Sequence, residues 1–293
     1  MSIQDLKKNS KNNMEDLQKK IEKMNKPQSQ NKDDRFWRHS VDSSGNGFAV
    51  IRFLDTPDGE SCPWVQLWEH GFKGPNGWYI EKSLTTIGKK DPCTELNSSL
   101  WNSGIESNKE IAKRQKRSLK YISNILVIKD PVHPENEGKV FLFKYGKKIF
   151  DKINELLYPD EIAGDDTQPI NPFDFWKGCN FKLKIKTVDK YPNYDNSKFD
   201  TQSALFDDDA KIEEVYKNEY KLFEFVNPES FKTYDQLKER LDTVLGLNDS
   251  SAHEKEKPAK EKVVEKTTPA VEDSYDNELD NAEFEALAKL VED

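Results

Sequence analysis

The sequence contains few of the residues and motifs on which disulfide-bonded proteins, membrane proteins and most enzymes depend. Its three cysteines, Cys62, Cys93 and Cys179, lie far apart and are odd in number, so we expect free thiols and a reducing compartment. No segment approaches the roughly 18 consecutive apolar residues of a membrane span, so no membrane contact is expected. There are only four histidines and no Walker, GxGxxG, HExxH or nucleophile-elbow motif. We therefore expect that the protein is not an enzyme.

Apolar residues are also scarce, since hydrophobic and charged residues each make up 34% of the 293 residues. Part of the chain is therefore expected to lie outside a folded core. The net charge of −9 argues at first against a nucleic-acid partner, because phosphate binding needs lysine and arginine at the contact surface. The charge is unevenly distributed, however, so this sum does not describe any single segment.

Changes in composition divide the chain into four segments. Residues 1–31 are polar and lysine-rich and read as a basic N-terminal arm. Residues 32–247 combine aromatic residues, short strand-like runs and Gly/Asn/Pro punctuation, which is typical of a folded core. Residues 248–270 are charged and contain proline, which predicts a flexible linker. Residues 271–293 carry nine acidic side chains against one lysine, so we expect a disordered acidic tail that binds other proteins.

The core pattern predicts an α+β domain. Strand-like runs occur at 48–54, 64–72, 121–130, 139–146 and 181–188, as in a small β-barrel with inserted helices. Helical spacing across Lys147–Leu157 places Ile149 and Ile153 on one face, and helical periodicity recurs at 212–225 and 234–245.

Basic and aromatic side chains alternate in two parts of this core. The first part holds Lys113, Arg114, Lys116, Arg117, Lys120 and then Tyr121, and the second holds Phe143, Lys144, Tyr145, Lys147 and Lys148. Nonspecific binding of single strands needs this combination, because cations follow the phosphates while aromatic faces stack on unpaired bases. A turn-rich segment with Tyr191 and Tyr194 is a third candidate, since loop tyrosines have less reason to be buried.

Each pattern also has a structural interpretation. A basic run can be the solvated face of a helix, and alternating aromatics in a strand are often core residues. Phe141, Phe143 and Tyr145 share one strand face, so either all three line a groove or all three pack inside. Tyr145 is the preferred groove residue of the three.

Five longer strings make the sequence resemble a known family. They are NGFAVIRFL (Asn46–Leu54), HGFKGPNGWYIE (His70–Glu81), NILVIKDPVHPENEGKVF (Asn124–Phe141), GKKIFDKIN (Gly146–Asn154) and NYDNSKF (Asn193–Phe199). In this order they resemble the single-stranded DNA-binding, helix-destabilising protein of T-even-type tailed bacteriophages. Strings of this length are highly specific.

The resemblance implies an OB-fold core, a five-stranded Greek-key β-barrel, with an inserted helical and β subdomain at about 60–125. It implies that the arm mediates cooperative self-association through a basic motif, whose nearest equivalents are Lys7, Lys8, Ser10 and Lys11. It also implies that the acidic tail recruits replication and recombination proteins. The DNA-contacting aromatics carried over are Trp101, Tyr121, Phe143, Tyr145, Tyr191 and Tyr194, with the basic run Lys113–Lys120 beside them.

The resemblance further implies a structural zinc ion held by one histidine and three cysteines. His70 and Cys93 occupy two of these positions, but Ser83 and Leu96 stand where the other two cysteines belong. Two ligands cannot close a tetrahedral structural site. We therefore expect no zinc or other cofactor, and a subdomain held by apolar packing of Trp64, Leu67, Trp78 and Leu84.

The expected function is cooperative, largely sequence-nonspecific coating of single-stranded DNA. By resemblance, it serves phage DNA replication, recombination and repair in the cytoplasm of the infected bacterial host. An RNA-binding translational regulator on the same fold is an alternative, because stacking platforms do not by themselves distinguish ribose from deoxyribose. A protein-interaction module without DNA affinity is the other alternative.

Overall fold

The computed structural model describes residues 33–159, 167–188 and 191–247. The predicted arm with Lys7, Lys8, Ser10 and Lys11, the linker 248–270 and the tail 271–293 lie outside the described residues. The strands are β1 (Gly47–Phe53), β2 (Val65–Gly74), β3 (Gly77–Lys82), β4 (Ser118–Lys129), β5 (Val140–Tyr145), β6 (Cys179–Val188), β7 (Tyr191–Asn193) and β8 (Lys198–Gln202). The α-helices are α2 (Pro92–Asn102), α3 (Glu106–Gln115), α4 (Lys147–Leu157), α5 (Asp209–Lys217) and α6 (Tyr234–Leu245). Short 3₁₀ helices are η1 (Leu84–Ile87), η2 (Pro134–Asn136), η3 (Phe223–Phe225) and η4 (Pro228–Ser230).

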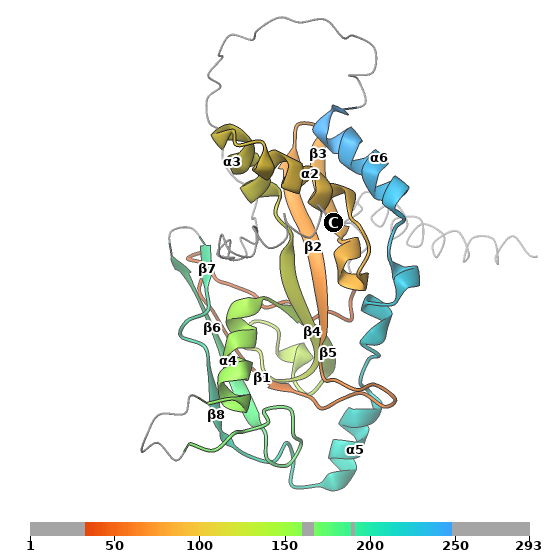
Figure 1. The fold of residues 1–293 in the computed structure, drawn as a ribbon. Coiled ribbons are helices and arrows are strands. Elements are labelled where there is room, and N and C mark those ends of the chain that lie inside the picture. The colour runs from red at the N-terminus through yellow and green to blue at the C-terminus, as the bar shows by residue number, and fades with distance from the viewer. Residues whose placement is uncertain (1–32, 160–166, 189–190, 248–293) are drawn as a thin grey trace, which may run out of the picture. The chain divides into compact units, whose positions relative to one another are not determined.

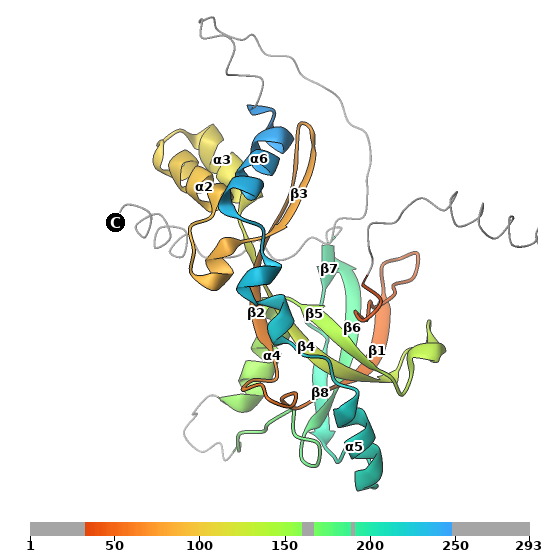
Figure 2. The same ribbon diagram turned by 90° about the vertical axis from the view of Figure 1, so that its right-hand side faces the viewer.

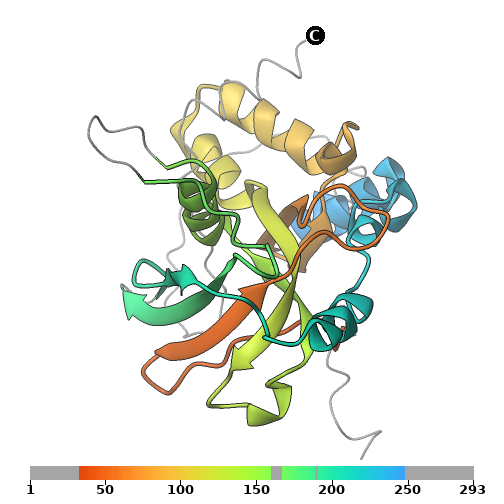
Figure 3. The ribbon, with the colours of Figure 1, turned by 90° about the horizontal axis from the view of Figure 1, so that it is seen from below.

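The strands form a curled antiparallel sheet in the order β3-β2-β4-β1-β6-β7, with β5 added to β4 and β8 added to β6. Figure 3 shows β6, β1 and β4 following one another around the curve of this half-barrel. The α+β class is therefore confirmed. Among the described helices, none is long and apolar enough to cross a membrane.

The main core is formed largely by side chains of β1, β4, β5 and β6 and is rich in aromatic rings. Phe53 of β1 is fully buried, and its ring centroid lies 5.4 to 6.3 Å from those of five other rings. Arg52, its neighbour in the strand, is also fully buried and donates hydrogen bonds of 2.8 Å from Nη2 to the carbonyl oxygens of Asp174 and Ser203. Arg52 of β1 thus holds in place the segment that precedes β6 and the segment that follows β8.

The predicted helix Lys147–Leu157 is confirmed as α4, with Ile149 and Ile153 buried against the main core. Phe150 of the same helix stacks on Tyr121 of β4, with ring centroids 3.9 Å apart and planes 5° from parallel. The helix therefore covers one part of the half-barrel.

A separate hydrophobic cluster lies at the far end of β2 and β3. Helices α2, α3 and α6 gather there, whereas α4, α5, β6 and β8 lie around the other end of β4 (Figures 1 and 2). The cluster joins Phe72, Tyr79 and Cys93 to Leu241 and Val244 of α6. The core of the region expected to form the inserted subdomain thus includes a helix that lies far along the chain, which the sequence pattern did not predict.

The expected packing of this subdomain is partly wrong. Leu67 and Leu84 are buried, but Trp78 is 36% exposed and Trp64 packs on Phe150 and Phe173 of the main core. Adjacent strand residues point to opposite faces. Because Tyr79 is fully buried, its neighbour Trp78 must point outward.

A buried carboxyl group lies in the segment after α5. This segment is fixed to the half-barrel by Asn124, which pairs with the backbone of Tyr220, and by Glu60, which accepts from the N–H groups of Leu222 and Phe223. Both carboxyl oxygens of Glu219 are buried without a hydrogen-bond partner among the described residues. Burial, reinforced by the charges of nearby carboxylates, raises the pKa of Glu219 to about 8.

We expect Glu219→Gln to stabilise the protein, and to do so increasingly as the pH rises from about 4.5 to about 8. In the unfolded chain the carboxyl ionises near its usual pKa of 4.5, whereas in the folded protein it stays protonated up to about pH 8. Unfolding therefore releases a proton, and the parent loses stability with pH over this interval. Glutamine avoids the loss, which amounts to about 4 kcal/mol at pH 8. Urea unfolding across this pH range, with exposed Glu229→Gln as control, checks the prediction, and a gain that does not grow with pH would contradict it.

Candidate nucleic-acid interface

The basic run predicted from the sequence lies at the C-terminal end of α3. Lys113 and Arg114 are exposed in its last turn, and half-buried Lys116 is its C-cap. Cations at this position also interact favourably with the helix dipole, so the fold itself favours them here. Lys113 pairs with Glu110 at 2.9 Å, and this hydrogen bond lowers the pKa of the glutamate. The exposed end of α3 therefore presents a positively charged surface.

Two tryptophans lie close to cations beside this helix. The guanidinium carbon of Arg117 is 4.1 Å from the ring centroid of Trp68, and Lys109 Nζ is 5.7 Å from the ring centroid of Trp101. Both tryptophans are half-buried, so each keeps part of its surface accessible. Contacts of this kind hold a planar ring and a cation in a fixed arrangement.

Trp68 and Lys109 were not among the predicted site residues. Trp68 pairs with Leu119 across β2 and β4, in the region where α3 leads through Arg117 into β4. Alternation along the strand-like run 64–72 could have placed Trp68 on the same face as His70. Nothing in the sequence, however, indicates that Arg117 lies over its ring.

Four of the predicted contact residues are buried in this structure. Lys120, Tyr121, Phe143 and Tyr145 are exposed by only 3%, 5%, 3% and 2%, respectively. Tyr145 stacks between neighbouring rings and its hydroxyl lies 2.9 Å from Ser123 Oγ, which satisfies its polar atom inside the core. The burial of Phe143 and Tyr145 agrees with the packing interpretation, and their contact with DNA stays a prediction.

The other predicted residues are more accessible but form two separate groups. Lys144 pairs with Glu69 of β2 at 3.0 Å, Lys147 pairs with Asp151 at 2.8 Å within α4, and Lys148 is half-buried next to it. Tyr191 is 58% exposed on β7, and Tyr194 lies edge-on to His39 with centroids 6.1 Å apart. In the sheet order, β7 is separated from β2 and β4 by β1 and β6. The tyrosines thus belong to a different part of the sheet from α3.

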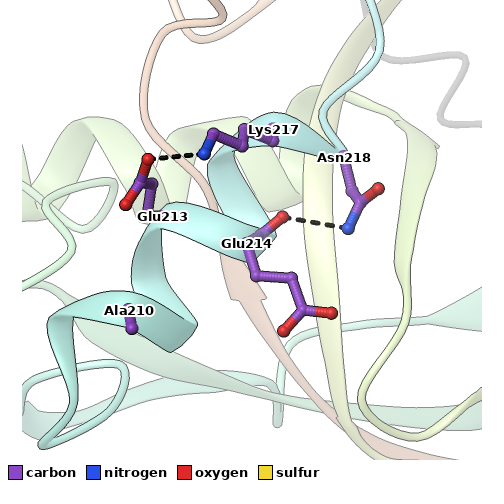
Figure 4. Close-up of a pocket in the computed structure, with 5 residues that line it drawn as sticks. All are labelled: Ala210, Glu213, Glu214, Lys217 and Asn218. Atoms are coloured by element: carbon purple, nitrogen blue, oxygen red, sulfur yellow. Dashed lines mark hydrogen bonds and ion pairs between the residues drawn. The ribbon is translucent and has the colours of Figure 1, made fainter.

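A depression of about 400 Å³ on α5 does not resemble a phosphate-binding site. It is lined by Ala210, Glu213, Glu214, Lys217 and Asn218 (Figure 4). Lys217 pairs with Glu213, and Asn218 bonds the carbonyl oxygen of Glu214 at 2.9 Å. Two carboxylates, one lysine that is already paired and no aromatic ring offer little to a nucleic acid.

The curled sheet with a basic helix at the ends of β2 and β4 is an arrangement suited to binding an extended anionic chain. Comparison with known proteins agrees with this class. A family described as "gp32 DNA binding protein like" matches residues 45–245. The chain therefore belongs to the gp32-like DNA-binding protein family.

Three relatives carry the name "single-stranded DNA-binding protein". The protein of Enterobacteria phage T4 is 39% identical over 212 residues, and that of Enterobacteria phage T2 is 40% identical over 212 residues. Both matches cover 72% of this chain and 70% of the relative. A protein of Escherichia phage SV14 is 46% identical over 57 residues, which cover 20% of this chain and 50% of that relative.

Proposed function

We propose that this protein binds single-stranded DNA with little sequence preference, through the basic end of α3 and the indole–cation pairs beside it. The observation that carries the proposal is the stacking of Arg117 on Trp68 at 4.1 Å, directly after the exposed cations of α3. Cations there attract phosphates, and a half-buried indole offers its remaining surface to an unpaired base. The family membership and the names of the relatives support the same ligand.

The finer parts of the proposal follow the resemblance. The half-barrel is an OB-fold, the core 32–247 binds DNA, and the arm 1–31 mediates cooperative association of copies along the strand. The tail 271–293 recruits replication and recombination proteins. The protein has no enzymatic activity of its own and acts in DNA replication, recombination and repair. It acts in the cytoplasm of the infected bacterial host, a location supported by the phage origin of its relatives.

Fluorescence titration with oligo-dT at several salt concentrations tests the proposal. Tight binding should quench the tryptophan emission, and the logarithm of the affinity should fall with log salt by about 0.7 per phosphate neutralised. If there is no quenching and no salt-dependent binding, a protein-interaction module without DNA affinity is favoured instead. Competition between DNA and RNA strands of equal length separates the DNA proposal from the RNA-binding regulator, which predicts that RNA is preferred.

We expect that deleting residues 248–293 strengthens DNA binding at low salt. The segment holds the acidic tail, whose carboxylates compete with phosphates for the basic surface. A tethered competitor acts at an effective concentration of about millimolar order, so even weak contacts count. The difference between full-length and shortened protein should shrink as salt is added, because screening weakens both interactions. Equal affinities at low salt would contradict the competition.

A further inference from the structure

The positions that correspond to the family's zinc ligands do not fit a tetrahedral metal site. Ser83 is fully buried and its hydroxyl caps η1, where it accepts from Thr85 N at 3.4 Å. Leu96 packs against the core of the subdomain. Within the described part of the chain, no group of three or more histidine, cysteine, aspartate and glutamate side chains could hold a metal ion.

A carboxylate lies beside the two ligand positions that remain. Asp91 is the N-cap of α2 and is 1% exposed. Its Oδ1 accepts from the backbone N–H groups of Cys93 and Thr94 at 3.1 and 3.0 Å, and its Oδ2 accepts from Leu84 N of η1 at 3.0 Å. His70 Nε2 of β2 is 3.3 Å from Oδ1. One side chain therefore connects β2, η1 and α2.

A backbone carbonyl group connects a fourth element, helix α3, to the other three. The oxygen of Gln115, the last residue of α3, accepts from His70 Nδ1 and from Asn97 Nδ2, each at 3.0 Å. The Cys93 thiol is directed at the same oxygen over 4.0 Å. His70 thus lies between the Asp91 carboxylate and the end of α3. The helix that carries the exposed cations is attached to the subdomain through this network.

We propose that this buried network, centred on the Asp91 carboxylate, joins the elements of the subdomain in place of the family's zinc ion. A structural zinc connects segments that are distant along the chain by binding four of their side chains. Here four elements are connected by hydrogen bonds to two acceptor groups. Charge-assisted hydrogen bonds to a buried carboxylate are among the stronger polar interactions in proteins. The subdomain accordingly folds without metal.

Metal analysis of the full-length protein, purified without chelator, is the first test. We expect well under one zinc per chain, and a melting temperature that changes by less than about 2 °C with excess EDTA or with added zinc. One zinc per chain, or a large loss of thermal stability with EDTA, would overturn the proposal. Both results come from the natural sequence and do not depend on any variant folding.

The second test compares two helix N-caps. Asp208 caps α5 at the surface by accepting from Ala210 N at 3.0 Å, and asparagine is nearly as good an N-cap as aspartate. Asp208→Asn should therefore shift the melting temperature by no more than about 2 °C. Asp91→Asn places an NH₂ group against backbone N–H donors and removes the charge beside His70, so we expect a decrease of about 10 °C.

Cys93→Ser completes the comparison. A serine hydroxyl can keep contacts with Asn97 and Gln115, so this variant should melt within about 4 °C of the parent. Equal shifts for Asp91→Asn and Asp208→Asn would show that the network adds nothing beyond an ordinary cap. If Asp91→Asn does not fold at all while Asp208→Asn does, the essential role of the carboxylate is upheld, and the zinc content decides whether a metal shares it.

Discussion

Replacing Lys113, Arg114 and Lys116 together by glutamine should weaken binding of oligo-dT about 100-fold near 0.1 M salt. Each cation that neutralises a phosphate contributes a factor of about 5 at this salt concentration, because counterions are released from the strand. The slope of log affinity against log salt should become shallower by about 2. Titrations of parent and variant over a range of salt concentrations give both quantities. Lys113 and Arg114 are exposed and Lys116 is half-buried, so we expect the three substitutions to leave the fold intact.

The matched control removes the same charge elsewhere. Lys129, Lys211 and Lys217 are exposed, and Lys129 ends β4 at the opposite end from α3. Helix α5 carries the other two and packs near that end, against Leu126 and Ile128. We expect glutamine at these three positions to reduce affinity less than threefold, through the general loss of positive charge. Equal losses for the two triple variants would mean that α3 is not a specific part of the interface.

The second large effect is expected from Trp68→Ala. Stacking of a base on an aromatic ring contributes about 1–3 kcal/mol, and the substitution also removes the surface on which the Arg117 guanidinium rests. We therefore expect about a 10-fold or larger loss of affinity that persists at high salt, because stacking is not screened. Quenching of the tryptophan emission should also decrease.

Trp176→Ala is the control for this substitution. Trp176 is 56% exposed, and its indole N–H bonds Asp209 at α5. Its replacement should change stability slightly and DNA affinity hardly at all. A salt-sensitive loss in Trp68→Ala, equal to the loss caused by removing Arg117 alone, would indicate that the ring only positions the cation.

Much of the half-barrel could be predicted because its sequence signals are local. The run 48–54 is apolar except for Arg52 and is bounded by turn residues, and it corresponds to β1. The apolar spacing of Lys147–Leu157 corresponds to α4 with unchanged bounds. The helix 234–245 was predicted equally well, helped by a strong start, since Thr233 and Gln236 form a capping box. These elements depend mainly on residues that are near one another in the chain.

The site was harder to predict, because exposure depends on tertiary packing. Phe143 and Tyr145 have the same sequence pattern whether they face a groove or a core. Only the tertiary structure, in which the rings of Phe53 and Trp37 pack against Phe143, shows that Phe143 is buried. Trp68 carried no local signal of its contact with Arg117, which lies nearly fifty positions later. Asp91 received no interpretation from the sequence, because its contacts with His70 and Leu84 depend on the tertiary structure.

The position of α6 has a consequence for how the chain is made. Tyr234 Oη bonds Glu95, 139 residues earlier, and Asn76 Nδ2 bonds the carbonyl oxygen of Thr243, 167 residues later. As the ribosome proceeds, β2, β3 and α2 emerge long before the helix that covers Phe72 and Tyr79. Their apolar surface stays uncovered through most of translation, when nascent chains are prone to aggregate. Genes truncated before codon 234 should therefore yield insoluble protein, even though strands β1 to β8 have all been synthesised.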